Sequence, residues 1–250
     1  MGKLADIDEV MYSCGLEVLH PGGIEKTDEL ARMCGIAGDK KVLDIGCGKG
    51  TTACFLAQKY GCRVVGLDCS ERMIEYSRTK AREKGLEDRV SFEKADALKL
   101  PFERESFDIV LAECTTTLLD KEKAFAEFLR VTKRGGWVGD SEMIWRKPPP
   151  EELVSRLFGL WEGFKTMTLP EWKAFSERMG LADVQAADFS ETIEDMEKSM
   201  KERLGFTGVA KMCFKLLVRP DLRSAMQEYR KIAEEYRDYM GYGCVVGRKR

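Results

Sequence analysis

The chain has 250 residues, of which 44% are hydrophobic and 34% charged, a balance typical of globular proteins with one large domain or two small ones. Lys and Arg total 41 against 43 Asp and Glu, so the formal charge of -2 gives no basic bias toward nucleic acid. No apolar run approaches the roughly 20 residues that span a bilayer, and the acidic N-terminus lacks a hydrophobic signal region. We therefore expect a cytoplasmic protein with no membrane span and no nucleic-acid partner.

Nine scattered cysteines form no CxxC pair, and there is one histidine. This pattern predicts small buried thiols rather than a disulfide framework or a metal site.

The first 40 residues are expected to be mostly helical. A helical segment around 4–12 precedes a turn that begins at His20 and contains two glycines. Thr27 is predicted to cap a helix that runs to about Cys34, because Asp, Glu and Leu follow it. His20 has two interpretations, a structural one and a role in substrate contact or proton removal.

A strand–glycine loop–helix sequence begins at residue 41. The apolar run from Val42 ends in the acid Asp44, and Gly46, Gly48 and Gly50 follow at alternate positions before a helical pattern. Glycines let the backbone turn sharply and approach a ligand, and the start of a helix offers free N–H donors. This segment predicts a nucleotide-cofactor site.

Strands and helices then alternate along the chain. Strands are predicted at 41–45, 63–67, 90–94, 107–112, 135–142 and 183–188, with a last one from Tyr242 to Arg248, and helices at 51–60, 70–84, 121–133, 150–161 and 170–179. Alternation of this kind predicts an α/β fold with helices on both faces of a parallel sheet, and ligands bind such sheets beyond the carboxyl ends of their strands. Residues 143–180 and 191–240 interrupt the pattern with helical insertions.

The downstream acids distinguish between cofactors. Thr51 occupies the third glycine position of the dinucleotide pattern, and Asp44 would repel a pyrophosphate but suit an ammonium group. Asp68 ends the second strand, where it can accept hydrogen bonds from both ribose hydroxyls. Asp96 ends the third strand, where a carboxylate can accept a bond from an adenine amino group.

This ordered set resembles the class I S-adenosylmethionine-dependent methyltransferases, over roughly 40–142 and the final strand. The resemblance implies a Rossmann-like, seven-stranded, mostly parallel sheet with a reversed last strand in a single domain (1–250), made of an N-terminal helical cap (1–40), a cofactor-binding core (41–142) and the two insertions. It implies S-adenosyl-L-methionine as cofactor, with S-adenosyl-L-homocysteine as product. The cofactor contacts that it implies come from the strand ends, the loops and the helix starts: Asp44, Gly46, Cys47, Gly48, Asp68, Cys69, Met73, Asp96, Ala97 and Glu113.

The predicted reaction is direct in-line transfer of a methyl group to a small-molecule acceptor. The chain is similar to the broad group that contains the ubiquinone/menaquinone-type and sterol-type methyltransferases. A base is optional because the sulfonium donor is already activated. His20 and Glu113 are the candidate catalytic residues, and Glu142 is a further polar group expected near the methyl. The acceptor atom stays open, and a homo-oligomer is compatible with the sequence.

Several alternatives remain beside this interpretation. Tyr76 and Lys80 match the YxxxK pair of short-chain dehydrogenases but lie too early in the chain. Cys114 resembles a metalloid-binding cysteine of arsenite methyltransferases, although no cysteine lies between 115 and 212, so metalloid or thiol methylation is an alternative. The fourth strand lacks the [DN]PP[YFW] motif of enzymes that act on nucleic-acid bases. A regulatory or partner module that binds the cofactor without catalysis is the alternative of another class.

Overall fold

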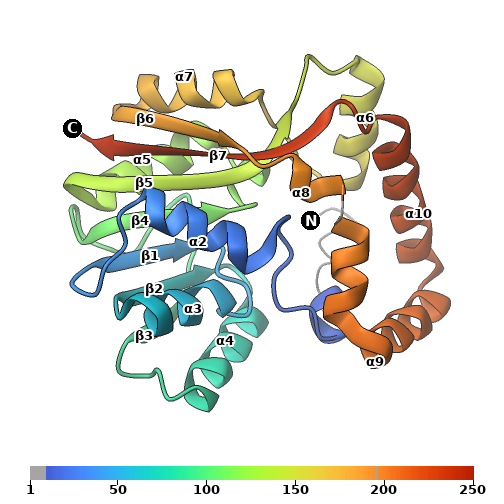
Figure 1. The fold of residues 1–250 in the computed structure, drawn as a ribbon, viewed down its shortest axis with the longest axis horizontal. Coiled ribbons are helices and arrows are strands. Elements are labelled where there is room, and N and C mark those ends of the chain that lie inside the picture. The colour runs from blue at the N-terminus through green and yellow to red at the C-terminus, as the bar shows by residue number, and fades with distance from the viewer. Residues whose placement is uncertain (1–9, 195) are drawn as a thin grey trace.

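The computed structural model describes residues 10–194 and 196–250, which contain a seven-stranded sheet of order β3-β2-β1-β4-β5-β7-β6 (Figure 1). The strands are β1 (Lys41–Ile45), β2 (Arg63–Asp68), β3 (Val90–Lys94), β4 (Phe107–Glu113), β5 (Thr132–Trp145), β6 (Leu181–Asp188) and β7 (Met240–Lys249). The pairs among β1 to β5 are parallel, whereas β7 runs antiparallel to both β5 and β6. The predicted α/β sheet with a reversed last strand is therefore confirmed.

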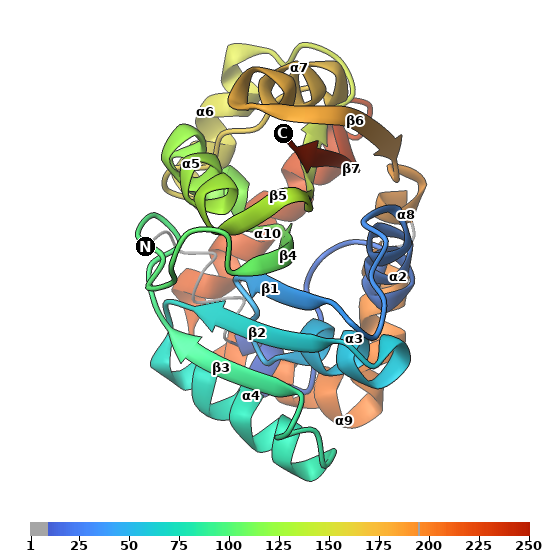
Figure 2. The ribbon, with the colours of Figure 1, turned by 90° about the vertical axis from the view of Figure 1, so that its left-hand side faces the viewer.

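Helices cover both faces of the sheet, as predicted (Figure 2). The helices that pack on its two faces are α2 (Gly23–Met33), α3 (Thr51–Tyr60) and α4 (Glu71–Glu83) on one side, and α5 (Lys121–Val131) and α7 (Leu169–Met179) on the other. Each face has its own apolar cluster, because β-strand side chains alternate between the two sides.

The remaining helices gather beyond the carboxyl ends of the parallel strands (Figure 1). These helices are α6 (Glu151–Leu160), α8 (Glu191–Glu194), α9 (Met196–Val218) and α10 (Pro220–Glu235), with the short 3-10 helix η1 (Thr116–Leu118) after β4. A third apolar cluster joins α6 and α10 to Trp145 at the end of β5. These elements are the helical insertions expected before and after the sixth strand. The division of the chain into a cap, a core and insertions stays a prediction.

Some element boundaries differ from those predicted. Strand β5 is longer at both ends than 135–142, although it still ends before Pro148. The expected cap at Thr27 is wrong, because α2 begins five residues earlier, after Gly22 in the left-handed conformation (φ 74). Most of the predicted segment 4–12 lies outside the described residues. Within them, no helix is long and apolar enough to cross a membrane.

Candidate cofactor-binding and catalytic site

The strand order reverses between β1 and β4. Strand β3 precedes β4 in the chain, yet β4 pairs with β1, so that Ile45 lies opposite Ala112. The glycine loop after β1 and Glu113 at the end of β4 therefore lie at the switch point, where open α/β sheets bind ligands.

The glycine loop has the backbone that its sequence predicts. Gly46, Gly48 and Gly50 have φ of 70, 51 and 72, a region that residues with a Cβ rarely adopt. A Cβ at Gly48 would lie 2.7 Å from the hydroxyl of Tyr12. Gly50 is also the N-cap of α3 and has no side-chain capping bond, so no cap side chain occupies the N–H groups at this helix start.

Asp44 is a buried carboxylate with an unsatisfied oxygen. Its side chain is 2% exposed, and Oδ2 has no hydrogen-bond partner. Burial, with the nearby charges of Glu113 and Asp68, raises its pKa well above the ordinary value. A buried, partnerless acceptor among other acids is a suitable place for a cationic ligand group.

Asp68 links the end of β2 to the glycine loop. Its Oδ2 accepts the backbone N–H of Gly48 at 3.0 Å, and its Oδ1 accepts that of Ser70 at 2.8 Å. Burial raises the pKa of Asp68, and these backbone N–H groups oppose the rise. Each oxygen keeps a second lone pair for a ligand hydroxyl.

The other predicted cofactor residues surround this edge of the sheet. Met73 is buried in the first turn of α4, which Ser70 caps. Cys47 and Ala97 are buried, whereas Cys69 is exposed. Asp96 is exposed and accepts the N–H of Leu98 at 2.9 Å, which closes a local turn.

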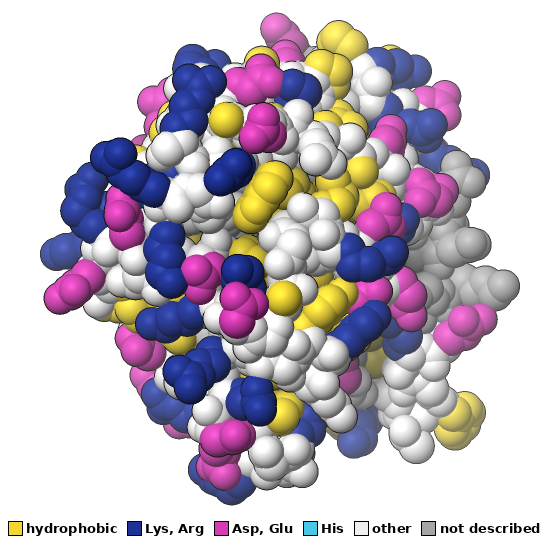
Figure 3. Space-filling view, turned by 60° about the vertical axis from the view of Figure 1, so that its left-hand side comes forward, with side chains coloured by type: hydrophobic (Ala, Val, Ile, Leu, Met, Phe, Trp, Pro, Cys, Tyr) yellow, Lys and Arg dark blue, Asp and Glu magenta, His cyan; other side chains and the backbone are white. Residues whose placement is uncertain are grey.

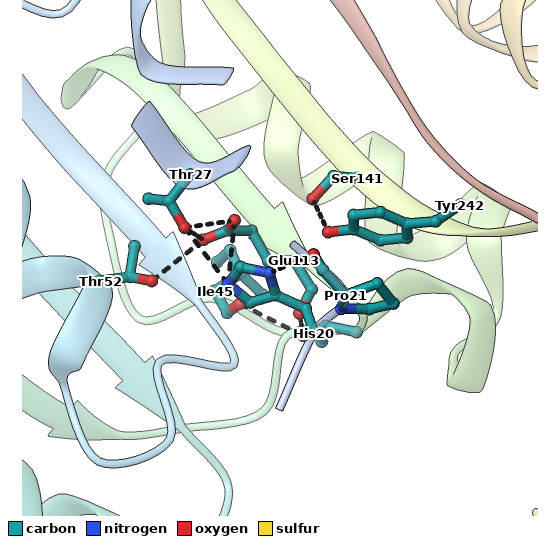
Figure 4. Close-up of polar contacts among 9 residues, drawn as sticks. His20, Pro21, Thr27, Ile45, Thr52, Glu113, Ser141 and Tyr242 are labelled. Carbon is teal, nitrogen blue, oxygen red and sulfur yellow. Dashed lines mark hydrogen bonds and ion pairs between the residues drawn. The ribbon is translucent and has the colours of Figure 1, made fainter. Parts of the chain in front are cut away.

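Glu113 is the centre of a buried polar cluster (Figure 4). Its carboxylate accepts the hydroxyl of Thr27 from α2 at 2.9 Å and that of Thr52 from α3 at 3.0 Å. Nε2 of His20 lies 3.3 Å from Oε1 of Glu113, and both side chains are 6% exposed. Nδ1 of His20 lies 3.2 Å from the carbonyl oxygen of Pro21, which can only accept, so Nδ1 carries a hydrogen.

The structure thus brings His20 and Glu113 together, as candidate catalytic residues should be. The sequence interpretation missed Thr27 and Thr52 as partners of Glu113. It also missed Tyr242, whose ring stacks on His20 at 6.4 Å between centroids and whose hydroxyl lies 2.9 Å from that of Ser141 (Figure 4). A pair of threonines, Thr51 and Thr52, directly after the glycine loop was the available signal for Thr52.

Glu142 belongs to a different polar cluster. Its carboxylate accepts the N–H of Thr115 at 2.7 Å and the hydroxyl of Thr117 at 2.8 Å, so it holds the turn after β4. Burial raises its pKa to about 7. The neighbouring Asp140 is buried, with one oxygen unpartnered, and burial and Glu142 raise its pKa. The structure therefore gives Glu142 a structural role that the sequence interpretation did not anticipate.

Comparisons with known proteins agree with this geometry. A family model described as a methyltransferase domain matches residues 42–136. The chain is 32% identical over 184 residues to Methyltransferase GfsG of Streptomyces halstedii, which covers 70% of this chain and 65% of that protein. It is 29% identical over 227 residues to the 27-O-demethylrifamycin SV methyltransferase of Amycolatopsis mediterranei. This match covers 89% of this chain and 82% of that protein. These findings support a class I S-adenosylmethionine-dependent methyltransferase.

Solved structures show the same fold as this methyltransferase. The crystal structure of the [4+2]-cyclase SpnF covers 99% of this chain and 95% of its own, with a TM-score of 0.77 and 21% identity. The Haemonchus contortus phosphoethanolamine N-methyltransferase 2 was solved in complex with S-adenosyl-L-methionine. The match covers 93% of this chain and 54% of that chain, with a TM-score of 0.76 and 20% identity. The chain spans less than two thirds of the length of the first curated relatives that it matches.

The residues at the switch point fit S-adenosylmethionine chemically. The unpartnered Oδ2 of Asp44 suits the ammonium group of the methionine part. A Cβ at Gly46 would meet Thr115 and one at Gly48 would meet Tyr12, so neighbouring side chains pack directly against the backbone of this loop. Asp68 offers lone pairs at the end of β2, the usual place for ribose contact.

A basic hollow lies at the opposite, amino-terminal edge of the sheet. Figure 3 shows Lys and Arg side chains gathered on this face. The hollow, of about 420 Å³, is lined by Gly38, Asp39, Lys40, Lys41, Arg63, Arg89, Asp108 and Lys133. The nearly neutral overall charge conceals this local patch.

The structure gives no new support to the metalloid alternative. Cys114 is half-buried at the end of β4, with a positive φ of 52. In the described part of the chain, no group of three or more His, Cys, Asp or Glu side chains is arranged to hold a metal ion.

Proposed function

We propose that this methyltransferase transfers a methyl group to an oxygen or nitrogen atom of an apolar small molecule, and that the His20–Glu113 pair accepts the proton that the acceptor loses. The observation that carries the proposal is this pair, buried at the end of β4 beside Asp44. A hydroxyl or protonated amine acceptor must lose a proton on methylation, and a positioned imidazole–carboxylate pair suits that step. The relatives described above include one named for O-methylation and one for N-methylation.

S-adenosylmethionine supplies a methyl group that its sulfonium already activates. Asp44 would take the ammonium group, and the backbone of Gly46, Cys47 and Gly48 would face the methionine part. Asp68 accepts the ribose hydroxyls with the lone pairs that Gly48 and Ser70 leave unused. Residues around the adenine are Cys69, Met73, Asp96 and Ala97.

The protein contributes alignment, exclusion of water and proton acceptance. When bound, S-adenosylmethionine would supply its methyl group to a lone pair of the acceptor atom and would leave as S-adenosylhomocysteine, with the electron pair of the broken carbon–sulfur bond on sulfur. The acceptor proton passes to Nε2 of His20, and the carboxylate of Glu113 stabilises the imidazolium that forms. Thr27 and Thr52 hold Glu113 in place and so act as positioning residues.

An apolar acceptor is supported by the third apolar cluster, beyond the carboxyl ends of the strands. Trp161 stacks on Phe164 and meets Tyr229 edge-on, with ring centroids 5.6 and 5.1 Å apart. A hollow of about 410 Å³ opens at this cluster, and its apolar lining residues are Trp145, Val154, Phe164 and Met167. Sites for small molecules are mostly of this kind, with few polar groups.

The test is methyl transfer from labelled S-adenosylmethionine to a panel of phenols, alcohols and amines of graded hydrophobicity. His20→Asn and Glu113→Gln are expected to lower kcat about 100-fold. The Kd of S-adenosylhomocysteine should stay within about threefold. Glu142→Gln, a buried glutamate of the other polar cluster, is the matched control and should keep kcat once its folding is verified.

Two results would contradict the proposal. Full activity of both variants would remove the proton-acceptor role. Tight S-adenosylhomocysteine binding without transfer to any acceptor would favour a cofactor-binding module. The same fold occurs in a protein described as a cyclase, so methyl transfer itself must be measured.

A further inference from the structure

The second half of α9 carries an apolar stripe on its outward face. Gly205, with φ 59 and ψ -179, interrupts the helix, and the stripe follows it. Its four members, called here the α9 stripe, are strongly exposed: Phe206 (90%), Phe214 (66%), Leu217 (67%) and Val218 (59%). Positions spaced by 8, 11 and 12 residues share one face of an α-helix, so the four side chains form one surface.

The inward face of α9 already has its own packing. Gly208 is buried, and a Cβ there would lie 2.7 Å from the carbonyl oxygen of Cys14. Val209 and Met212 pack against a small cluster that contains Cys14. Lys215 donates a hydrogen bond to the hydroxyl of Ser13 at 2.6 Å. The α9 stripe is therefore additional to the folding core, and exposed apolar surfaces of this kind mark interaction sites.

The charges beside the α9 stripe indicate what covers it. Glu202 and Asp221 are the acids among the described side chains from 202 to 223. The cations in that stretch are more numerous: Arg203, Lys211, Arg223, Arg219, which pairs with Asp221, and Lys215, which is bonded to Ser13 on the inward face. This excess contrasts with the chain's net charge of -2. A second copy that met this face symmetrically would bring the same cations against them, whereas anionic lipid headgroups complement them.

We propose that α9 docks this protein on a membrane surface that contains anionic lipids. The α9 stripe enters the boundary between headgroups and acyl chains, and the exposed Lys211 and Arg223 contact headgroup phosphates. Interfacial helices combine these two features, an apolar face and a cationic border. The proposal does not depend on the acceptor or on methyl transfer.

The test is co-sedimentation of the full chain with phosphatidylcholine vesicles that contain one quarter phosphatidylglycerol, compared with phosphatidylcholine alone. Binding to the anionic vesicles is expected, and it should weaken as salt is added. The double variant Phe214→Ser/Leu217→Ser should bind at least tenfold more weakly, and Lys211→Gln about fivefold more weakly. The matched controls are Phe158→Ser on α6, where the side chain is 47% exposed, and Arg134→Gln at the amino-terminal edge, and both should bind as the parent does.

Thermal unfolding and S-adenosylhomocysteine affinity should be unchanged in every variant, because the altered side chains lie on the surface. No binding to anionic vesicles, or equal binding by the double variant, would overturn the proposal. A dimer in light scattering that the double variant converts to a monomer would assign the α9 stripe to a second copy of the chain instead.

Discussion

Asp44→Asn is expected to stabilise the free protein and to weaken cofactor binding. Asp44 is 2% exposed, lacks a partner for Oδ2 and has Glu113 and Asp68 as charged neighbours. Each unit by which its pKa is raised corresponds to about 1.4 kcal/mol of destabilisation when the group is ionised. An unsatisfied buried polar group costs roughly 1–3 kcal/mol, so replacing the carboxylate by an uncharged amide should raise the free energy of unfolding at pH 8 by about that much.

The gain depends on pH in a defined direction. The folded-state pKa of Asp44 lies above the unfolded value, so the folded protein retains a proton that the unfolded chain releases as pH rises past about 4. Stability of the parent protein therefore falls with rising pH between the two pKa values. The difference between variant and parent should vanish below about pH 4 and be complete above the folded-state pKa. Urea unfolding at several pH values measures it.

Cofactor affinity should change in the opposite sense. Loss of a charge-assisted hydrogen bond of about 1.5–3 kcal/mol weakens binding about 10- to 150-fold, measured by calorimetry with S-adenosylhomocysteine. Asp140→Asn is the matched control, because Asp140 is equally buried, has one unpartnered oxygen and a raised pKa, but lies beside Glu142. The Asp140→Asn variant should be more stable than the parent protein and should bind S-adenosylhomocysteine with unchanged affinity. A less stable Asp44→Asn variant, or one with unchanged affinity, would refute the reasoning.

Two further variants test the glycine loop and Asp68, which binds its backbone. Asp68→Ala should weaken S-adenosylhomocysteine binding about 30-fold, because it removes two ribose hydrogen bonds of about 1 kcal/mol each, and the exposed Glu71→Ala serves as the calorimetric control. An unchanged Kd would remove Asp68 from the site. Gly48→Ala should lower both Tm and affinity, the latter at least tenfold, because its φ is positive and its Cβ would meet Tyr12. Gly85→Ala has a similar φ of +63 but open space, so it should affect Tm alone, and an equal loss of affinity there would argue against a specific role for the loop.

The strand, glycine loop and helix at this edge of the sheet could be predicted because their signals are local. The apolar run before Asp44, the glycines and the following helix are contiguous in the chain, and each element forms where its own residues predict it. Asp68 could be placed because the ends of neighbouring parallel strands meet at one edge of a sheet. The backbone of this region follows from short stretches of sequence, so the prediction succeeded there.

The environment of Glu113 could not be predicted, because its partners are remote in sequence. Thr27 and Thr52 lie 86 and 61 residues away from it, and no local pattern joins them. Thr27 fitted a capping position because acidic residues follow it. Gly22 begins the helix instead, and the Thr27 hydroxyl, in the second turn of α2, donates to Glu113 across the packing between α2 and the sheet. Tertiary packing therefore decided the role of this residue.

The segment 12–20 contacts both the glycine loop and α9. Nζ of Lys49, in the glycine loop, donates to the carbonyl oxygens of Tyr12 at 3.1 Å and Leu16 at 3.3 Å. On its other side, Lys215 of α9 donates to Ser13. The same segment ends at His20, so the position of the proposed proton acceptor depends on contacts from both the cofactor loop and the proposed docking helix. Because none of these contacts is local in sequence, the meeting of the glycine loop, the proposed catalytic pair and α9 at this segment emerges only from the folded chain.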